Sequence, residues 1–321
     1  MSWSNSPISR REFVLGGVTA LVAVACSKGG GTTPRPTGSI TSVGSIKELT
    51  HGAVQLSLIQ AQDEIPKGGG LFAFGLSTPG GGLLTGGSPL VFAAQDETSK
   101  PLGPFRADYH QFAPPSQFND KTIPRSPITG FYSVELAIPT AGTWLLAAVA
   151  SASGKRAVGV GASPVKDKVP NEVGSKATPV KTPVATTKRK LEEICTRKPP
   201  DPMHYVSLDD ALKNGKPTVV SFATPLLCTS RMCGPVVDEQ LLVFQSVGKD
   251  KANFIHVEEF LPGPDLDPPL PRLENQSSPF KAWHLTTEPW VFVIDRGGTI
   301  REAFAGPVVA SQIDAALRPL L

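Results

Sequence analysis

The 321-residue chain has no strong excess of charge of either sign. Its 31 Lys and Arg against 28 Asp and Glu leave a formal net charge of +3 at pH 7. Binding to a nucleic-acid backbone needs a concentrated basic surface, whereas much of this small excess falls within residues 166–202. We therefore expect no nucleic-acid partner.

A hydrophobic run long enough to cross a membrane comfortably is missing from the N-terminal region. The apolar stretch from Phe13 to Ala25 is too short for this, but it has the length of the hydrophobic part of an export signal. Arg10 and Arg11 precede it in a pattern that resembles a twin-arginine motif. Residues 1–26 are therefore predicted to be an export signal.

The end of this signal has two interpretations. Ala23-Val24-Ala25-Cys26 resembles a bacterial lipobox, in which Cys26 would be acylated, and it also fits the cleavage site of an ordinary signal peptidase. We favour the lipoprotein because a single cysteine falls at the boundary and residues 27–45 are rich in Gly, Thr and Pro, as in a flexible tether. The predicted location is the extracytoplasmic face of the cell membrane, held by a lipid anchor.

Cysteine and histidine are both scarce. With Cys26 assigned to the signal, only Cys195, Cys228 and Cys233 remain, and the close pair should form a disulfide in an oxidising compartment. The five histidines show no diagnostic metal-binding spacing, so we expect neither a metal site nor a cofactor.

Residues 46–165 alternate apolar and polar side chains in short runs, with no convincing helix. Glycine-rich turns separate these runs, which predicts an all-β sandwich. The segments 130–132 and 142–144 resemble a hairpin of immunoglobulin-like domains. Residues 166–202 are rich in Lys and Pro and are predicted to be a linker.

The remaining residues, 203–321, predict a mixed α/β domain. Ser207 has the position of a helix N-cap in a capping box, and Gly248 lies where a helix C-terminus is expected. The pattern predicts helices near 207–215, 235–247, 278–285 and 309–320, and strands at 218–222, 253–260, 290–294 and 299–304.

Cys228 and Cys233 lie between an apolar strand and a helix that should begin near Pro235. The partial positive charge of a helix N-terminus stabilises a thiolate, which is the reactive form in disulfide exchange. Arg231 lies between the two cysteines and would add to this effect. A reactive thiol pair is therefore predicted here.

Residues 203–321 resemble the thioredoxin-like family in their order of elements, in Phe222-Ala223-Thr224 before the cysteines, and in Glu288-Pro289 before a hairpin. The resemblance implies that Pro289 is cis, faces the cysteines and, with Trp290 and Arg231, borders a bound substrate.

The spacing departs from the family's usual Cys-x-x-Cys, because four residues separate Cys228 and Cys233. Either cysteine can be aligned with the attacking thiol of the family. We expect Cys233 to be the more activated, since it adjoins the helix directly.

The leading hypothesis is a membrane-tethered, extracytoplasmic thiol–disulfide oxidoreductase, whose partners are exported proteins with thiols or disulfides. Two alternatives remain open. One is a non-catalytic binding lipoprotein with a structural disulfide, and the other is a copper-handling protein that uses the cysteine pair with His204, His256 or His284.

Two further side chains are assigned no catalytic role. Asp238 is expected to be a solvated surface carboxylate, so no general base is evident. Cys195 is a buried inert thiol, an alternative disulfide partner or a site of intermolecular pairing.

We expect Cys26→Ser to release the processed protein from membranes, because serine cannot carry the thioether-linked lipid. Fractionation of cells into membrane and soluble extracts, with immunoblotting, measures this. Membrane retention of the substituted, still-processed protein would contradict the lipoprotein interpretation.

Overall fold

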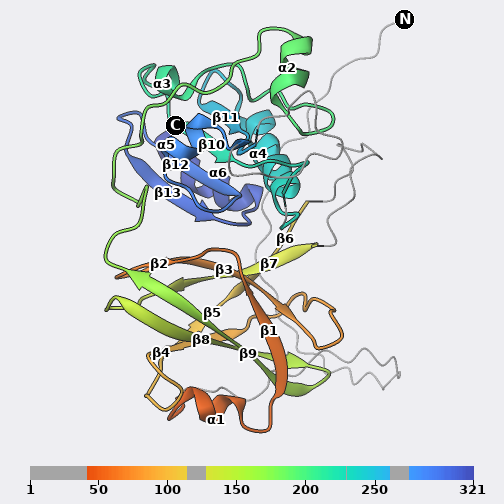
Figure 1. Ribbon diagram of the computed structural model, residues 1–321, viewed down its shortest axis with the longest axis vertical. Coiled ribbons are helices and arrows are strands. Elements are labelled where there is room, and N and C mark those ends of the chain that lie inside the picture. The colour runs from red at the N-terminus through yellow and green to blue at the C-terminus, as the bar shows by residue number, and fades with distance from the viewer. Residues whose placement is uncertain (1–41, 114–127, 229, 261–274) are drawn as a thin grey trace, which may run out of the picture. The chain divides into compact units, whose positions relative to one another are not determined.

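A computed structural model describes residues 42–113, 128–228, 230–260 and 275–321, and these residues form two hydrogen-bonded sheets (Figure 1). The first part of the chain is built almost entirely of strands. Its elements are α1 (Ile46–Thr50), β1 (Val54–Gln60), β2 (Ile65–Pro66), β3 (Gly70–Ser77), β4 (Leu90–Ala94), β5 (Leu102–Arg106), β6 (Asp108–Gln111), β7 (Gly130–Leu136), β8 (Gly142–Ala152) and β9 (Lys155–Lys166).

The strands predicted in this region are confirmed, but they form one nearly closed sheet rather than two packed sheets. The strand order is β5-β4-β8-β9-β1-β3-β7-β6, with β2 paired to β9. Strand β9 pairs with β8 on one side and with β1 on the other, so it joins strands that a sandwich would divide. Aromatic side chains such as Phe72, Phe74 and Tyr132 fill the interior. The immunoglobulin-like topology stays a prediction.

Helix α1 was not anticipated from the sequence. It begins after Ser45, whose hydroxyl accepts a hydrogen bond from the backbone N–H of Glu48 at 3.2 Å. The Glu48 carboxylate accepts one from the Gly44 N–H at 2.8 Å. These two bonds satisfy N–H groups that a short helix otherwise leaves open, so five residues suffice for one turn.

The second part of the chain contains a four-stranded sheet with helices. Its elements are α2 (Lys188–Ile194), α3 (Leu208–Ala211), β10 (Thr218–Phe222), α4 (Cys233–Val247), β11 (Asn253–Val257), α5 (Ser278–Ala282), β12 (Trp290–Ile294), β13 (Ile300–Ala305), α6 (Ala310–Leu317) and the 3-10 helix η2 (Arg318–Leu320). The strand order is β11-β10-β12-β13, with β10 parallel to β11 and antiparallel to β12. The predicted mixed sheet is confirmed.

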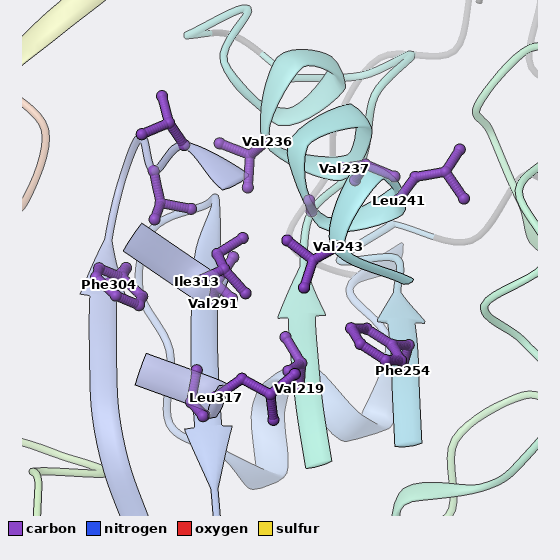
Figure 2. Packing of buried hydrophobic residues seen from close by; sticks show 14 of the residues in the cluster. Val219, Val236, Val237, Leu241, Val243, Phe254, Val291, Phe304, Ile313 and Leu317 are labelled. Atoms are coloured by element: carbon purple, nitrogen blue, oxygen red, sulfur yellow. The ribbon is translucent and has the colours of Figure 1, made fainter. Parts of the chain in front are cut away.

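Helices cover both faces of this sheet. On one face, Val219, Phe254 and Val291 pack with side chains of α4 and α6, as Figure 2 shows. On the other face, Phe222 and Phe292 pack with Trp283 and with residues of α3 and α5. Every residue of β10 is buried, as expected for a central strand covered on both sides.

Two local predictions had opposite outcomes. Gly248 follows α4 with φ of 84°, which is a left-handed conformation that favours glycine, and its N–H donates to the Phe244 carbonyl. The capping box at Ser207 is wrong, because its hydroxyl makes no cap hydrogen bond to α3. Instead it accepts from the Thr182 N–H and donates to the Asp209 carboxylate.

The region predicted as a linker contains structure that its composition did not suggest. Residues 188–194 form α2, and Thr187 accepts the N-cap hydrogen bond of this helix. Cys195, Arg197 and Asp201 are buried. Within the described ranges, no helix combines the length and the hydropathy that a membrane span requires.

We expect Ile313→Ala to lower the free energy of unfolding by about 2–5 kcal/mol, because it removes methylene groups from the filled interface between α6 and the sheet. Urea denaturation of the purified protein measures this. The matched control is Ile59→Ala on an exposed side chain, which should change the value by less than about 0.5 kcal/mol. Equal effects at the two positions would contradict the packing argument.

Candidate functional site

Cys228 and Cys233 form a disulfide between the carboxyl end of β10 and the start of α4. Their Cα atoms are 6.0 Å apart, which is within the range that a disulfide allows. Helix α4 begins at Cys233, two residues earlier than predicted from Pro235. The pair therefore lies at a helix N-terminus, where backbone N–H groups stabilise a thiolate.

The two sulfurs differ in accessibility. Cys233 is completely buried, whereas Cys228 is half-buried. The Cys228 sulfur accepts a hydrogen bond from the Cys233 N–H at 3.3 Å and lies 3.1 Å from the Ser230 hydroxyl. Both contacts stabilise negative charge on Cys228. The expectation that Cys233 is the more activated thiol stays a prediction, whereas the lower burial of Cys228 favours Cys228 as the sulfur that a substrate reaches.

The Glu288 carboxyl group lies beside the disulfide. One of its oxygens and the two sulfurs are all within 4.8 Å of one another. Burial raises the pKa of Glu288 to about 9, and the nearby Glu259 carboxylate adds to the increase. Glu288 is therefore protonated at neutral pH, which makes it a proton donor next to the sulfurs. Sequence reasoning missed this residue, although its place before Pro289 was a signal.

Thr224 connects this carboxyl group to the backbone after β11. Its hydroxyl accepts hydrogen bonds from the N–H groups of Glu259 and Phe260 at 2.8 and 3.1 Å. Hydrogen bonding from Thr224 to Glu288 partly offsets the increase in the pKa of Glu288. Thr224 thus contacts both Glu288 and the backbone after β11.

The other predicted site residues differ in burial and in their position on the fold. Pro289 is buried and follows a cis peptide bond, as the resemblance implied. Arg231 is exposed, with a positive φ of 58°. Trp290 stacks on Phe292, on the sheet face opposite α4. The substrate-binding roles of these residues stay predictions, and Arg10, Arg11 and Cys26 lie outside the described residues.

Asp238 is not the solvated carboxylate that the sequence suggested. Its side chain accepts a hydrogen bond from Arg197 Nε at 2.8 Å and is 24% exposed. Burial raises the pKa of Asp238 to about 6, although the Arg197 charge opposes the increase. Asp238 anchors the segment after α2 to α4 instead of serving the cysteines.

A second polar cluster lies nearby and was not recognised from the sequence. Cys195 is a buried free thiol, which confirms one of its three expected fates. It lies together with Asp201, His204 and His256. His284, the third copper candidate, is exposed. In the described part of the chain, the group around Cys228 and Cys233 contains Glu288 but no histidine.

Comparison with known proteins gives limited similarity. No protein-family model and no curated protein matches the chain. Over part of its length it is structurally similar to a thiol-disulfide isomerase from Corynebacterium glutamicum, with 20% identity, a TM-score of 0.30, and coverage of 37% of this chain and 89% of the other. A thioredoxin-family thiol:disulfide interchange protein from Chlorobium tepidum has 17% identity, a TM-score of 0.28, and coverage of 46% and 99%. Titin M4 has 11% identity, a TM-score of 0.17, and coverage of 35% and 93%.

We expect Glu288→Gln to become increasingly more stable than the wild type as the pH rises from 5 to 9. The folded-state pKa lies above the unfolded one, so between the two values the folded protein holds a proton that the unfolded chain has released. The contribution of Glu288 to wild-type stability therefore falls with pH across this window, by up to about 1.4 kcal/mol per pH unit, and glutamine avoids the loss.

Urea denaturation of the oxidised proteins at several pH values measures this difference. The control is Glu97→Gln, since Glu97 is exposed and its substitution removes no buried carboxyl group. A stability gap between Glu288→Gln and the wild type that stays constant from pH 5 to 9 would show that Glu288 is not held protonated.

Proposed function

We propose that this protein is a membrane-tethered, extracytoplasmic thiol–disulfide oxidoreductase that acts through Cys228 and Cys233. One observation carries the proposal: the disulfide joins a half-buried cysteine to a completely buried one at a helix N-terminus, with a buried carboxyl group beside them. A disulfide that only stabilised the fold would need neither the asymmetry nor the acid.

The asymmetry assigns the two sulfurs different roles. When the oxidised protein accepts electrons, a substrate thiolate attacks the Cys228 sulfur, the Cys228–Cys233 bond breaks, and Cys233 leaves as a thiolate. A second substrate thiolate then attacks the mixed disulfide. This releases the oxidised substrate and leaves Cys228 reduced, so two electrons pass from substrate to protein. In the opposite direction the Cys228 thiolate attacks a substrate disulfide, and Cys233 resolves the mixed disulfide.

Glu288 supplies the proton that these steps require. Cys233 is buried, so its thiolate lacks water to stabilise it when the disulfide opens. The protonated Glu288 carboxyl group, within 4.8 Å of the sulfur, donates a proton to the Cys233 thiolate. In the reverse step the carboxylate removes this proton, and Cys233 becomes a nucleophile again.

The substrates are exported proteins with accessible thiols or disulfides. Arg231 is exposed between the two cysteines, and Pro289 adjoins Glu288, so both are proposed to border the bound chain with Trp290. Acylated Cys26 and the tether at residues 27–45 would hold this site outside the cytoplasm, after export directed by Arg10 and Arg11.

We expect Cys233→Ser to trap a mixed disulfide with substrate, because Cys228 still attacks and the resolving thiol is gone. Non-reducing electrophoresis of cell extracts, followed by mass spectrometry of the bands that reductant removes, measures this. Cys228→Ser should trap nothing, since its remaining thiol is buried.

Cys195→Ser is the control for free thiols, because Cys195 is buried and outside the disulfide. It should leave insulin reduction by the purified protein within about twofold of the wild-type rate. Trapping by Cys228→Ser alone would reverse the two roles. If neither variant traps a substrate and the disulfide resists millimolar glutathione, the function as an oxidoreductase fails and the non-catalytic binding lipoprotein replaces it.

A further inference from the structure

We propose that Cys195, Asp201, His204 and His256 form a zinc site, distinct from the cysteine pair and structural in role. Cys195 caps the C-terminus of α2, Asp201 and His204 lie in the segment that follows, and His256 is on β11. All four side chains are at least 98% buried. One ligand atom from each lies within 4.8 Å of the others.

The distances between these atoms fit one small ion. The Asp201 Oδ2 atom lies 3.2 Å from the Cys195 sulfur, 2.8 Å from His256 Nδ1 and 3.7 Å from His204 Nε2. The Cys195 sulfur lies 3.9 Å from His256 Nδ1. Tetrahedral zinc with bonds of about 2.0–2.3 Å holds its ligand atoms about 3.3–3.8 Å apart. Because all pairs of these atoms lie within 4.8 Å, shifts of about 1 Å or less would convert the cluster into that arrangement.

The His256 ring is already oriented as a metal ligand. Its Nε2 atom lies 2.9 Å from the Ala223 carbonyl, which can only accept a hydrogen bond, so Nε2 carries a proton. Nδ1 points at Asp201 and Cys195, where it carries either a second proton or a metal ion. A hydrogen bond from the outer nitrogen to a carbonyl is the usual support of a metal-bound histidine.

His204 provides a second, independent observation. Its Nε2 atom is buried and has no hydrogen-bond partner among the described residues. The nearest carboxylate oxygen, on Asp201, is 3.7 Å away, too far for a hydrogen bond. A buried ring nitrogen without a partner is costly, and a metal ion between His204 and Asp201 removes this cost.

The chemistry of the four ligands selects zinc. Cysteine, histidine and aspartate are its usual protein ligands, and four of them complete a closed tetrahedral site. A thiolate and a carboxylate together balance the two charges of the ion, which suits a site without water. Copper(I) prefers sulfur ligands, whereas this cluster contains one sulfur and a carboxylate.

A bound ion would hold two segments of the chain together. It would join the segment after α2 to β11, directly beside Ala223 at the end of β10. It would also keep Cys195 from pairing with Cys228 or Cys233, because a zinc-bound thiolate is held in place. Zinc binding by the cluster therefore requires that Cys195 stay reduced in an oxidising compartment.

Zinc binding tests this directly, in a Cys228→Ser/Cys233→Ser protein so that the reduced pair cannot hold metal. We expect this protein to retain about one zinc ion per chain after gel filtration, measured by plasma mass spectrometry. Cobalt(II) should give a thiolate-to-metal charge-transfer band. Zinc should also raise the melting temperature, because only the folded state holds all four ligands together.

His204→Gln in the same background should weaken zinc affinity by at least about tenfold, measured by competition with a chromophoric chelator. The Nε2 atom of His204 has no hydrogen-bond partner in the metal-free fold, so its replacement breaks no hydrogen bond at that atom and this variant should fold, which circular dichroism checks. Cys195→Ser should abolish the cobalt charge-transfer band. His284→Gln, on an exposed histidine, is the matched control and should bind zinc as tightly as the parent.

Failure of the parent protein to retain zinc would overturn the proposal, as would retention that His204→Gln and Cys195→Ser leave unchanged. The cluster would then be a buried ion pair between His256 and Asp201. Because the disulfide is absent from these proteins, either result is independent of the proposed oxidoreductase function.

Discussion

Complete burial of β10 is the constraint on which the rest of the C-terminal part depends. All five of its residues are covered, Val219 by α4 and α6 and Phe222 by Trp283 and α5. Strand β10 lies between β11 and β12, so both of its edges are hydrogen-bonded to neighbouring strands. Hydrogen bonds to Val257 and Glu259 then hold Ala223 and Thr224, which directly follow β10.

Two chemical centres meet at this end of β10. The Ala223 carbonyl faces His256, and the Thr224 hydroxyl holds the backbone of Glu259. Glu258, next along the chain, accepts hydrogen bonds from the N–H and hydroxyl of Thr196, which directly follows Cys195. Hydrogen bonds thus connect the end of β10 to residues 256–259 and to the segment that holds the buried cluster.

Much of the fold could be predicted from local patterns. The bounds of β10 and the end of α4 at Gly248 follow from an apolar run and from a glycine that permits positive φ. Predictions were less accurate where the hydrogen-bond partner of a side chain is distant in the sequence. Ser207 has the sequence of a capping box, but its hydroxyl bonds to Thr182, whose position the sequence near Ser207 does not specify.

The sequence by itself determined which residues were available: a close cysteine pair after an apolar strand, and Glu288-Pro289 before a hairpin. Only the tertiary structure decided which cysteine of the pair is less buried, that the pKa of Glu288 is raised, and that Cys195 meets His256. The physical reason is that accessibility and protonation depend on burial and on neighbouring charges. Both arise from contacts between segments that are distant in the chain, which no local pattern encodes.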